Sequence, residues 1–292
     1  MPPSHSLPRP HDADRDRSNT GFTRVYRLTR LLLHIAYGCV GVAAMFPFLS
    51  HQWRRRLIQS WSRQTLGIVH LRVTVRGSPP SGRTPTLIVS NHVSWLDICV
   101  LHSVAPLRFV AKSDVRGWPM VGYLASGVGT IFVERGNPLD TVRTNRAIVQ
   151  ALSRGEHVAM FPEGTSTDGS EIKRFHPSLF QPALEAAVQV VVVALRYVNP
   201  DGSINPEASY AGERSLWESF RLVAGRRSLL AELTFAATID VNGRPRADIA
   251  RAAECAAADA LQLPRPGRKV GTAINAPHLT PSTSPDITYP VQ

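Results

Sequence analysis

Residues 188–198 read VQVVVVALRYV, a run that is almost wholly apolar and dominated by β-branched side chains. Such a run is typical of a strand whose two faces are both buried, as in the middle of a sheet that carries helices on each side. The segment therefore predicts a sheet covered by helices on both faces.

Outward from this run, segments with the alternating pattern of strands are interleaved with segments of helical periodicity. Strands are expected at 68–76, 86–90, 109–114, 129–135, 157–164 and 229–239. Helices are expected at 94–104, 119–127, 138–153, 177–187, 213–224 and 246–262. This alternation predicts the α/β fold class, with a mixed, largely parallel central sheet flanked by helices.

Composition divides the chain into four parts. Residues 67–262 hold the alternating strands and helices and form the α/β domain. Residues 1–20 and 263–292 are polar or rich in Pro, Ser and Thr, so they bury too little apolar surface to offset the entropy of ordering. We expect both to be flexible tails, and residues 21–66 to be a separate basic, helical region.

The chain has a formal net charge of +11, and its positive charge is concentrated in the first third of the sequence. No Asp or Glu occurs between Arg17 and Leu96. That stretch carries eleven arginines: Arg17, Arg24, Arg27, Arg30, Arg54, Arg55, Arg56, Arg63, Arg72, Arg76 and Arg83. Such a field attracts anionic lipid headgroups, acidic carrier proteins or nucleic acid.

An uncharged segment among these arginines favours the lipid. Residues 31–49 read LLLHIAYGCVGVAAMFPFL, which is barely long enough to span a bilayer. We expect a membrane-associated helical segment, spanning or re-entrant, with a buried core helix as the alternative. Residues 51–66 mix Trp53 and Trp61 with arginines, which indicates a basic amphipathic helix at the membrane interface or an ordinary surface helix.

The cysteines indicate the compartment. The chain has three cysteines, Cys39, Cys99 and Cys255, and no CxxC pair. A disulfide framework is therefore not expected, and this cysteine usage is consistent with a reducing compartment. Basic residues flank the apolar segment on both sides, so they do not orient it. Together these features predict a protein of the inner (cytoplasmic) membrane whose folded domain faces the cytoplasm.

The first motif that carries chemistry is NHVSWLD, residues 91–97. His92 and Asp97 are five residues apart at an expected strand-to-helix turn, where the carboxylate can bond one ring nitrogen and leave the other basic. That arrangement suits a general base, although a histidine at a helix start is more often structural.

Two further motifs follow expected strands. GTIFVER (129–135) ends in Arg135, whose guanidinium can bind two oxygens of a phosphate or carboxylate. The alternative is that Arg135 forms a surface ion pair. FPEGTS (161–166) places Glu163, Gly164 and Thr165 in a turn, where backbone amides and hydroxyls can approach a ligand. Taken singly, a lone Arg after a strand more often forms a surface ion pair, and the third motif is a turn with a polar cap.

In this order and spacing the three motifs resemble the 1-acylglycerol-3-phosphate acyltransferase family, and VALRY (193–197) looks like the last motif of that family. The resemblance covers about residues 65–240 and makes 67–262 the catalytic domain. It implies that His92 is the general base and Asp97 its orienting partner.

The resemblance also implies a substrate site. Arg135 would bind the anionic head of the acceptor, Glu163, Gly164 and Thr165 would complete the site, and Lys112 matches a basic position before the second motif. The implied reaction moves a fatty acyl group from acyl-ACP or acyl-CoA, as co-substrate, to a lysolipid hydroxyl. It needs no cofactor, no metal and no enzyme nucleophile.

The acceptor is expected to be 1-acylglycerol-3-phosphate in membrane lipid biosynthesis. KRFHPSLF (173–180) departs from the segment that follows the third motif in many members, and the longer context looks closer to the lyso-ornithine lipid acyltransferase branch. Expected partners are membrane lipids, the lysolipid and, where it is the donor, an acidic acyl carrier protein.

Other classes of function fit less well. For a nucleic-acid-binding module, the sequence lacks both the ligand spacing of a zinc site and a recognisable binding motif, and its arginines are grouped around an apolar segment. Nucleic acid is therefore not an expected partner. A membrane-bound metal-dependent phosphohydrolase using His92, Asp97 and Glu163 would need further ligands, and none stands out. A catalytically silent lipid-binding relative is a further alternative.

Overall fold

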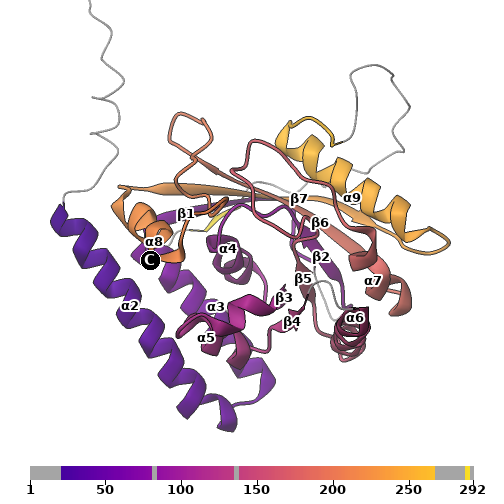
Figure 1. The fold of residues 1–292 in the computed structure, drawn as a ribbon, viewed down its shortest axis with the longest axis horizontal. Helices are drawn as coiled ribbons and strands as arrows, with labels where there is room; N and C mark the ends of the chain where they lie inside the picture. The colour runs from indigo at the N-terminus through magenta and orange to yellow at the C-terminus, as the bar shows by residue number, and fades with distance from the viewer. Residues whose placement is uncertain (1–20, 81–83, 135–137, 267–286, 290–292) are drawn as a thin grey trace, which may run out of the picture.

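The computed structural model describes residues 21–80, 84–134, 138–266 and 287–289 of the 292-residue chain. Its centre is an eight-stranded sheet in the order β4-β3-β5-β2-β6-β7-β1-β8 (Figure 1). The strands are β1 (Leu71–Arg76), β2 (Leu87–Ser90), β3 (Arg108–Lys112), β4 (Ile131–Val133), β5 (Val158–Met160), β6 (Val190–Val198), β7 (Leu229–Ile239) and β8 (Ile287–Tyr289).

Parallel pairing dominates the sheet. The pairs β4–β3, β3–β5, β5–β2, β2–β6 and β7–β1 are parallel, whereas β6–β7 and β1–β8 are antiparallel. The expected α/β class with a mixed, largely parallel sheet is therefore confirmed.

Helices cover both faces of the sheet (Figure 1). They are α2 (Gly21–Ala44), α3 (His51–Ile68), α4 (Leu96–Val104), α5 (Val121–Gly127), α6 (Pro138–Ser153), α7 (Gln181–Glu185), α8 (Leu216–Gly225) and α9 (Arg246–Leu261), with 3-10 turns η1 (Phe46–Phe48), η2 (Ser113–Gly117) and η3 (Pro177–Phe180). Helices α6, α7 and α9 contribute to the core on one face, and α3, α4 and α8 to the core on the other.

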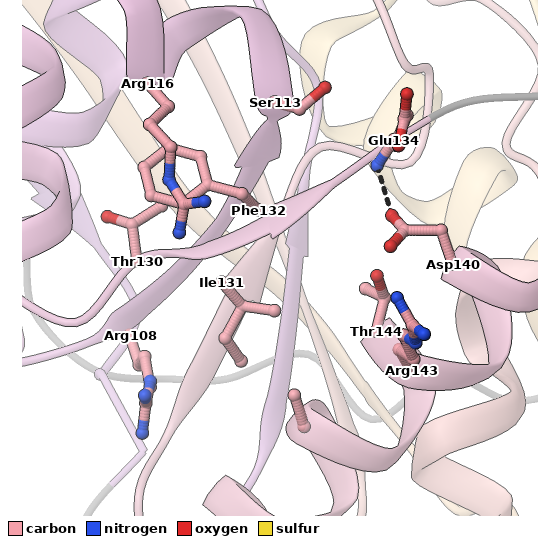
Figure 2. Close-up of a pocket in the computed structure, with 11 residues that line it drawn as sticks. Arg108, Ser113, Arg116, Thr130, Ile131, Phe132, Glu134, Asp140, Arg143 and Thr144 are labelled. Carbon is pink, nitrogen blue, oxygen red and sulfur yellow. Dashed lines mark hydrogen bonds between the residues drawn. The ribbon is translucent and has the colours of Figure 1, made fainter. Parts of the chain in front are cut away.

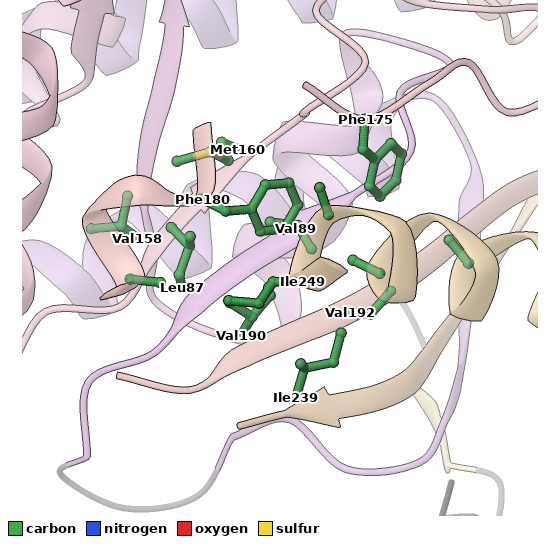
Figure 3. Packing of buried hydrophobic residues seen from close by; sticks show 14 of the residues in the cluster. Leu87, Val89, Val158, Met160, Phe175, Phe180, Val190, Val192, Ile239 and Ile249 are labelled. Carbon is green, nitrogen blue, oxygen red and sulfur yellow. The ribbon is translucent and has the colours of Figure 1, made fainter. Parts of the chain in front are cut away.

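Strand β6 shows why both faces are covered. Val190 and Val192 belong to the core beneath α9 (Figure 3), and Val191 and Val193 belong to the opposite core. Because successive side chains of a strand point to opposite faces, an apolar residue at every position needs two apolar layers. The double-sided burial expected for 188–198 is confirmed.

Helix α2 is anchored to the domain by a buried arginine. Arg27 donates to the carbonyl oxygens of Arg226 and Arg227, and its Nη2 lies 2.8 Å from His70 Nδ1. Leu31 and Ile35 pack with Phe220 of α8 in a third small core. Within the described ranges, no helix has both the length and the apolarity of a membrane span.

Many element boundaries differ from expectation by a few residues, and two differences have a clear structural reason. The strand expected from residue 68 begins at Leu71, because α3 continues to Ile68 and the chain reverses at His70, whose φ is 53°. Ile287–Tyr289 lie in an expected flexible tail, yet they form β8 against β1. This pairing satisfies backbone groups that β1 would otherwise expose at the sheet edge.

Candidate active site

The first and third motifs lie side by side because their strands are neighbours. β2 leads into Asn91 and His92, and the adjacent parallel strand β5 leads into Phe161 and Glu163. Parallel strands end at the same edge of a sheet, which is where α/β proteins usually bind ligands. The Asn91 side chain fixes this corner through two 2.8 Å hydrogen bonds with the backbone of Leu195 on β6.

His92 and Asp97 meet as the sequence predicts. His92 Nδ1 lies 2.7 Å from Asp97 Oδ2, and the same oxygen accepts the backbone N–H groups of Val93 at 2.8 Å and Ser94 at 3.0 Å. This geometry arises because α4 begins at Leu96 and its first turn brings the Asp97 carboxylate back over the preceding residues.

The other oxygen of Asp97 has a partner that sequence analysis missed. Tyr197 on β6 donates its phenol hydroxyl to Asp97 Oδ1 at 2.7 Å. Burial first, and then the nearby Asp97, raise the pKa of Tyr197 well above its usual value, so Tyr197 stays protonated and donates. These donors offset the cost of burying the Asp97 carboxylate.

Among the described residues, the Nε2 atom of His92 has no hydrogen-bond partner. The ring stacks on Phe161 with centroids 4.0 Å apart and an interplanar angle of 13°, and its side chain is 21% exposed. Because Nδ1 is held by Asp97, Nε2 is the nitrogen left to accept a proton. Nearby Cys99 is buried, and burial raises the pKa of its thiol to about 12, so it stays an unreactive thiol.

Glu163 connects the two motifs through the backbone. Its Oε1 accepts the N–H of His92 at 3.0 Å and its Oε2 accepts the N–H of Lys173 at 3.2 Å. The side chain is 4% exposed, and burial raises the pKa of its carboxyl to about 7. In addition, Thr167 donates its backbone N–H to the His92 carbonyl at 2.8 Å. Glu163 thus holds two loops together.

The remaining predicted residues are more spread out. Gly164 lies in the turn after Glu163 with a φ of 73°, which explains the glycine, and Thr165 beside it is exposed. Lys112 ends β3 and forms an exposed ion pair with Asp114. Arg135 lies outside the described residues. Among the described residues, no group of three or more His, Cys, Asp or Glu side chains is placed to hold a metal ion.

Comparison with known proteins gives the class. The family model described as Acyltransferase matches residues 72–197. A lyso-ornithine lipid O-acyltransferase of Pseudomonas aeruginosa is 38% identical over 209 residues, which is 71% of this chain and 79% of that protein. The chain therefore belongs to the acyltransferase family and is an O-acyltransferase, as its three motifs predicted.

Other relatives extend the comparison. A 1-acyl-sn-glycerol-3-phosphate acyltransferase of Neisseria meningitidis is 34% identical over 193 residues, 65% of this chain and 74% of that protein. The crystal structure of the 1-acyl-sn-glycerophosphate acyltransferase of Thermotoga maritima has a TM-score of 0.61 at 18% identity, covering 82% of this chain and 96% of that one. At that identity the likeness shows a shared fold.

Proposed function

We propose that this enzyme moves a fatty acyl group from an acyl thioester, acyl-ACP or acyl-CoA, to the hydroxyl of a lysolipid in membrane lipid biosynthesis. The observation that carries the proposal is the His92–Asp97 pair, in which one nitrogen is held by a buried carboxylate and the other is left for the substrate. The proposed reaction requires no cofactor.

In the proposed mechanism, Nε2 of His92 removes the proton of the lysolipid hydroxyl while its oxygen attacks the thioester carbonyl carbon. Asp97 stabilises the imidazolium that forms, as the aspartate of a serine-protease triad does. The tetrahedral intermediate then expels the thiolate, which takes the proton back from His92. The products are an ester and a free thiol, and no acyl-enzyme forms.

The acceptor site is proposed to lie on the loops after β4 and β5. Arg135 and Lys112 would supply positive charge, and Gly164 and Thr165 would supply backbone and hydroxyl groups. Since both carboxylate oxygens of Glu163 bond backbone N–H groups, its proposed contribution is to hold these loops in place.

Two acceptors are compatible with this site. The first is 1-acylglycerol-3-phosphate, as in the Neisseria relative, and the second is a lyso-ornithine lipid, as in the Pseudomonas relative. The observation that favours the second is the higher identity to the Pseudomonas relative, 38% against 34%. The loop at 173–180 departs from the usual family sequence and is folded into the domain by Phe175. The side chain of Phe175 is buried, and its N–H bonds Glu254 at 2.7 Å.

We infer that the N-terminal helices lie on the inner membrane, with the catalytic domain on the cytoplasmic side. α2, η1 and α3 carry large apolar side chains that are at least 40% exposed: Phe22, Val25, Tyr26, Leu32, Leu33, Tyr37, Val40, Met45, Phe48 and Trp53. Arginines flank them, and apolar side chains beside basic ones suit an interface with anionic lipids. The same positive charge would attract an acidic acyl carrier protein.

The test is acyl transfer by the purified protein in detergent or vesicles. Labelled acyl-ACP and acyl-CoA are each offered with lysophosphatidic acid and with lyso-ornithine lipid. Wild type should acylate one acceptor, and His92→Ala should lower the rate by several orders of magnitude. His51→Ala, an exposed histidine outside the site, is the control. Undiminished activity of His92→Ala would refute the mechanism.

A further inference from the structure

A groove runs along the outer edge of β4, between η2 and α6 (Figure 2). Its volume is about 410 Å³, within the range of small-molecule sites. Side chains from both walls line it, among them Arg116, Phe132, Glu134, Asp140, Arg143 and Thr144. Since β4 pairs only with β3, no other strand of the described sheet fills this edge.

Charges of both signs line this groove without neutralising one another. In the described parts of the chain, the carboxylate of Glu134 and the guanidinium of Arg143 form no hydrogen bond or ion pair. Arg116 lies over the ring of Phe132, 4.8 Å from its centroid, and makes no ion pair there. By contrast, Arg108 at the far end of the groove is already paired with Glu156 at 3.2 Å.

The acidic side of the groove is held in place by the backbone. Asp140, in the first turn of α6, accepts the N–H of Glu134 at 2.6 Å through Oδ2. This bond ties the end of β4 to α6 and keeps two carboxylates at the same end of the groove (Figure 2). Thr144, one turn further along α6, is buried and adds a hydroxyl to the wall.

We propose that this groove binds the headgroup of a zwitterionic acceptor, one that carries an ammonium and a carboxylate. Glu134, with Asp140 beside it, receives the ammonium, and Arg143 and Arg116 receive the carboxylate. N-acylated ornithine has this pair of charges. A phosphate monoester would instead meet two carboxylates, and such like-charge contacts discriminate against the wrong ligand. This inference rests on the proposed function and specifies its acceptor class.

The groove and the proposed base follow the same edge of the sheet. β4, β3, β5 and β2 are successive parallel strands, so Glu134 and His92 follow strand ends on that edge. Three strand spacings amount to about 14 Å. In an N-acylated ornithine the hydroxyl lies on the acyl chain, and the extended molecule from its ammonium to that hydroxyl spans a comparable length. A headgroup held in the groove can therefore place the acyl-chain hydroxyl toward His92.

The kinetic test compares three acceptors: lyso-ornithine lipid, its δ-N-acetyl derivative, which lacks the ammonium, and lysophosphatidic acid. With wild type, acetylation should raise KM about tenfold or more. Glu134→Gln should raise KM for lyso-ornithine lipid by a similar factor, leave kcat within a few-fold and abolish the preference for the free ammonium. Arg143→Gln should raise KM for both ornithine lipids. Arg146→Gln, an exposed arginine of α6 that does not line the groove, should behave as wild type.

A binding measurement separates this inference from the proposed catalysis. Full-length His92→Ala, with and without Glu134→Gln, is titrated calorimetrically with a soluble short-chain analogue, N-(3-hydroxybutanoyl)ornithine, and with its δ-N-acetyl form. Discrimination that depends on Glu134 supports the groove even if wild type acylates neither lipid. Equal binding of both forms, or a wild-type preference for lysophosphatidic acid, overturns the inference while leaving the role of His92 intact.

Discussion

The phenol hydroxyl of Tyr197 and the imidazole of His92 bond opposite oxygens of one buried carboxylate. Tyr197 donates to Asp97 Oδ1 at 2.7 Å, and Asp97 Oδ2 lies 2.7 Å from His92 Nδ1. With both oxygens held, the Asp97 carboxylate cannot rotate away from the ring. Tyr197 is therefore a positioning residue that joins the end of β6 to the proposed base.

Removing the phenol hydroxyl should weaken catalysis without disturbing substrate binding. We expect Tyr197→Phe to lower kcat about 10- to 100-fold with little change in KM, since a mispositioned base loses transition-state contacts. Val198→Ala, which trims a buried neighbour on β6, should lower stability and leave kcat unchanged. A Tyr197→Phe variant whose kcat stays within twofold of wild type would show that the bond is only structural.

Neutralising the carboxylate itself should cost far more. Asp97→Asn keeps the shape but presents an amide where Val93, Ser94, Tyr197 and His92 all donate. We expect kcat to fall by about three to four orders of magnitude, by analogy with the same change in a serine-protease triad. Circular dichroism would confirm that the variant is folded, and Asp168→Asn, an exposed aspartate, should retain full activity. A loss under tenfold would contradict the assigned role of Asp97.

The contrast between His92 and Tyr197 shows what sequence could predict about the site. His92 and Asp97 are five residues apart, and a helix starting between them is enough to bring them together. Tyr197 is 100 residues from Asp97, and their contact depends on the register of β6 against β2. Its one signal in sequence is a phenol hydroxyl in a strand that is apolar apart from Arg196, and such a hydroxyl must find a partner once it is buried.

The fold also has features that the sequence could predict and features that it could not. Alternating patterns predicted the strands and most helices, because periodicity reflects which faces are buried. They could not predict that β7 runs antiparallel to β6, since both strands are apolar and the connection 199–228, which contains α8, is long enough for a parallel crossover as well. Likewise, residues 31–49 read as one apolar segment, yet α2 ends at Ala44 and buries only one side, including Leu31 and Ile35.

Glu163 should make stability depend on pH. The carboxyl ionises near pH 4.5 when unfolded, whereas burial raises its pKa in the folded protein to about 7. Between these values the folded state keeps a proton that the unfolded state has lost, so the free energy of unfolding falls as pH rises. The total is about 3 kcal/mol. In urea titrations from pH 4.5 to 7, Glu163→Gln should become more stable relative to wild type by roughly that amount, and a constant difference would contradict the assignment.

His102 should produce the opposite trend. It is buried on α4, its Nδ1 has no hydrogen-bond partner, and burial lowers its pKa from 6.5 to about 4. Between pH 6.5 and about pH 4, the imidazole of His102 binds a proton in the unfolded chain but not in the folded protein. The free energy of unfolding therefore falls as pH falls through this range. Relative to wild type, His102→Leu should gain about 2 kcal/mol between pH 7 and pH 5. His176→Leu, at an exposed histidine, should show no such gain.

The exposed apolar side chains of the N-terminal helices should control binding to membranes. Phe22 at the start of α2 and Phe48 in η1 are 83% and 87% exposed. Arg27 fixes α2 to the domain, so these rings keep their position relative to the active site. Each buried ring contributes about 1.5–3 kcal/mol, so even partial insertion of both favours binding about tenfold or more.

We therefore expect the double variant Phe22→Ser, Phe48→Ser to bind vesicles containing phosphatidylglycerol at least tenfold more weakly than wild type in sedimentation assays. Val142→Ser changes an exposed apolar residue on α6, away from α2 in Figure 1, and should bind as wild type does. Added salt should weaken the remaining binding, because the flanking arginines act through screened charge. Binding that is unaffected by the double variant but abolished by salt would mean that charge alone attaches the enzyme to its membrane.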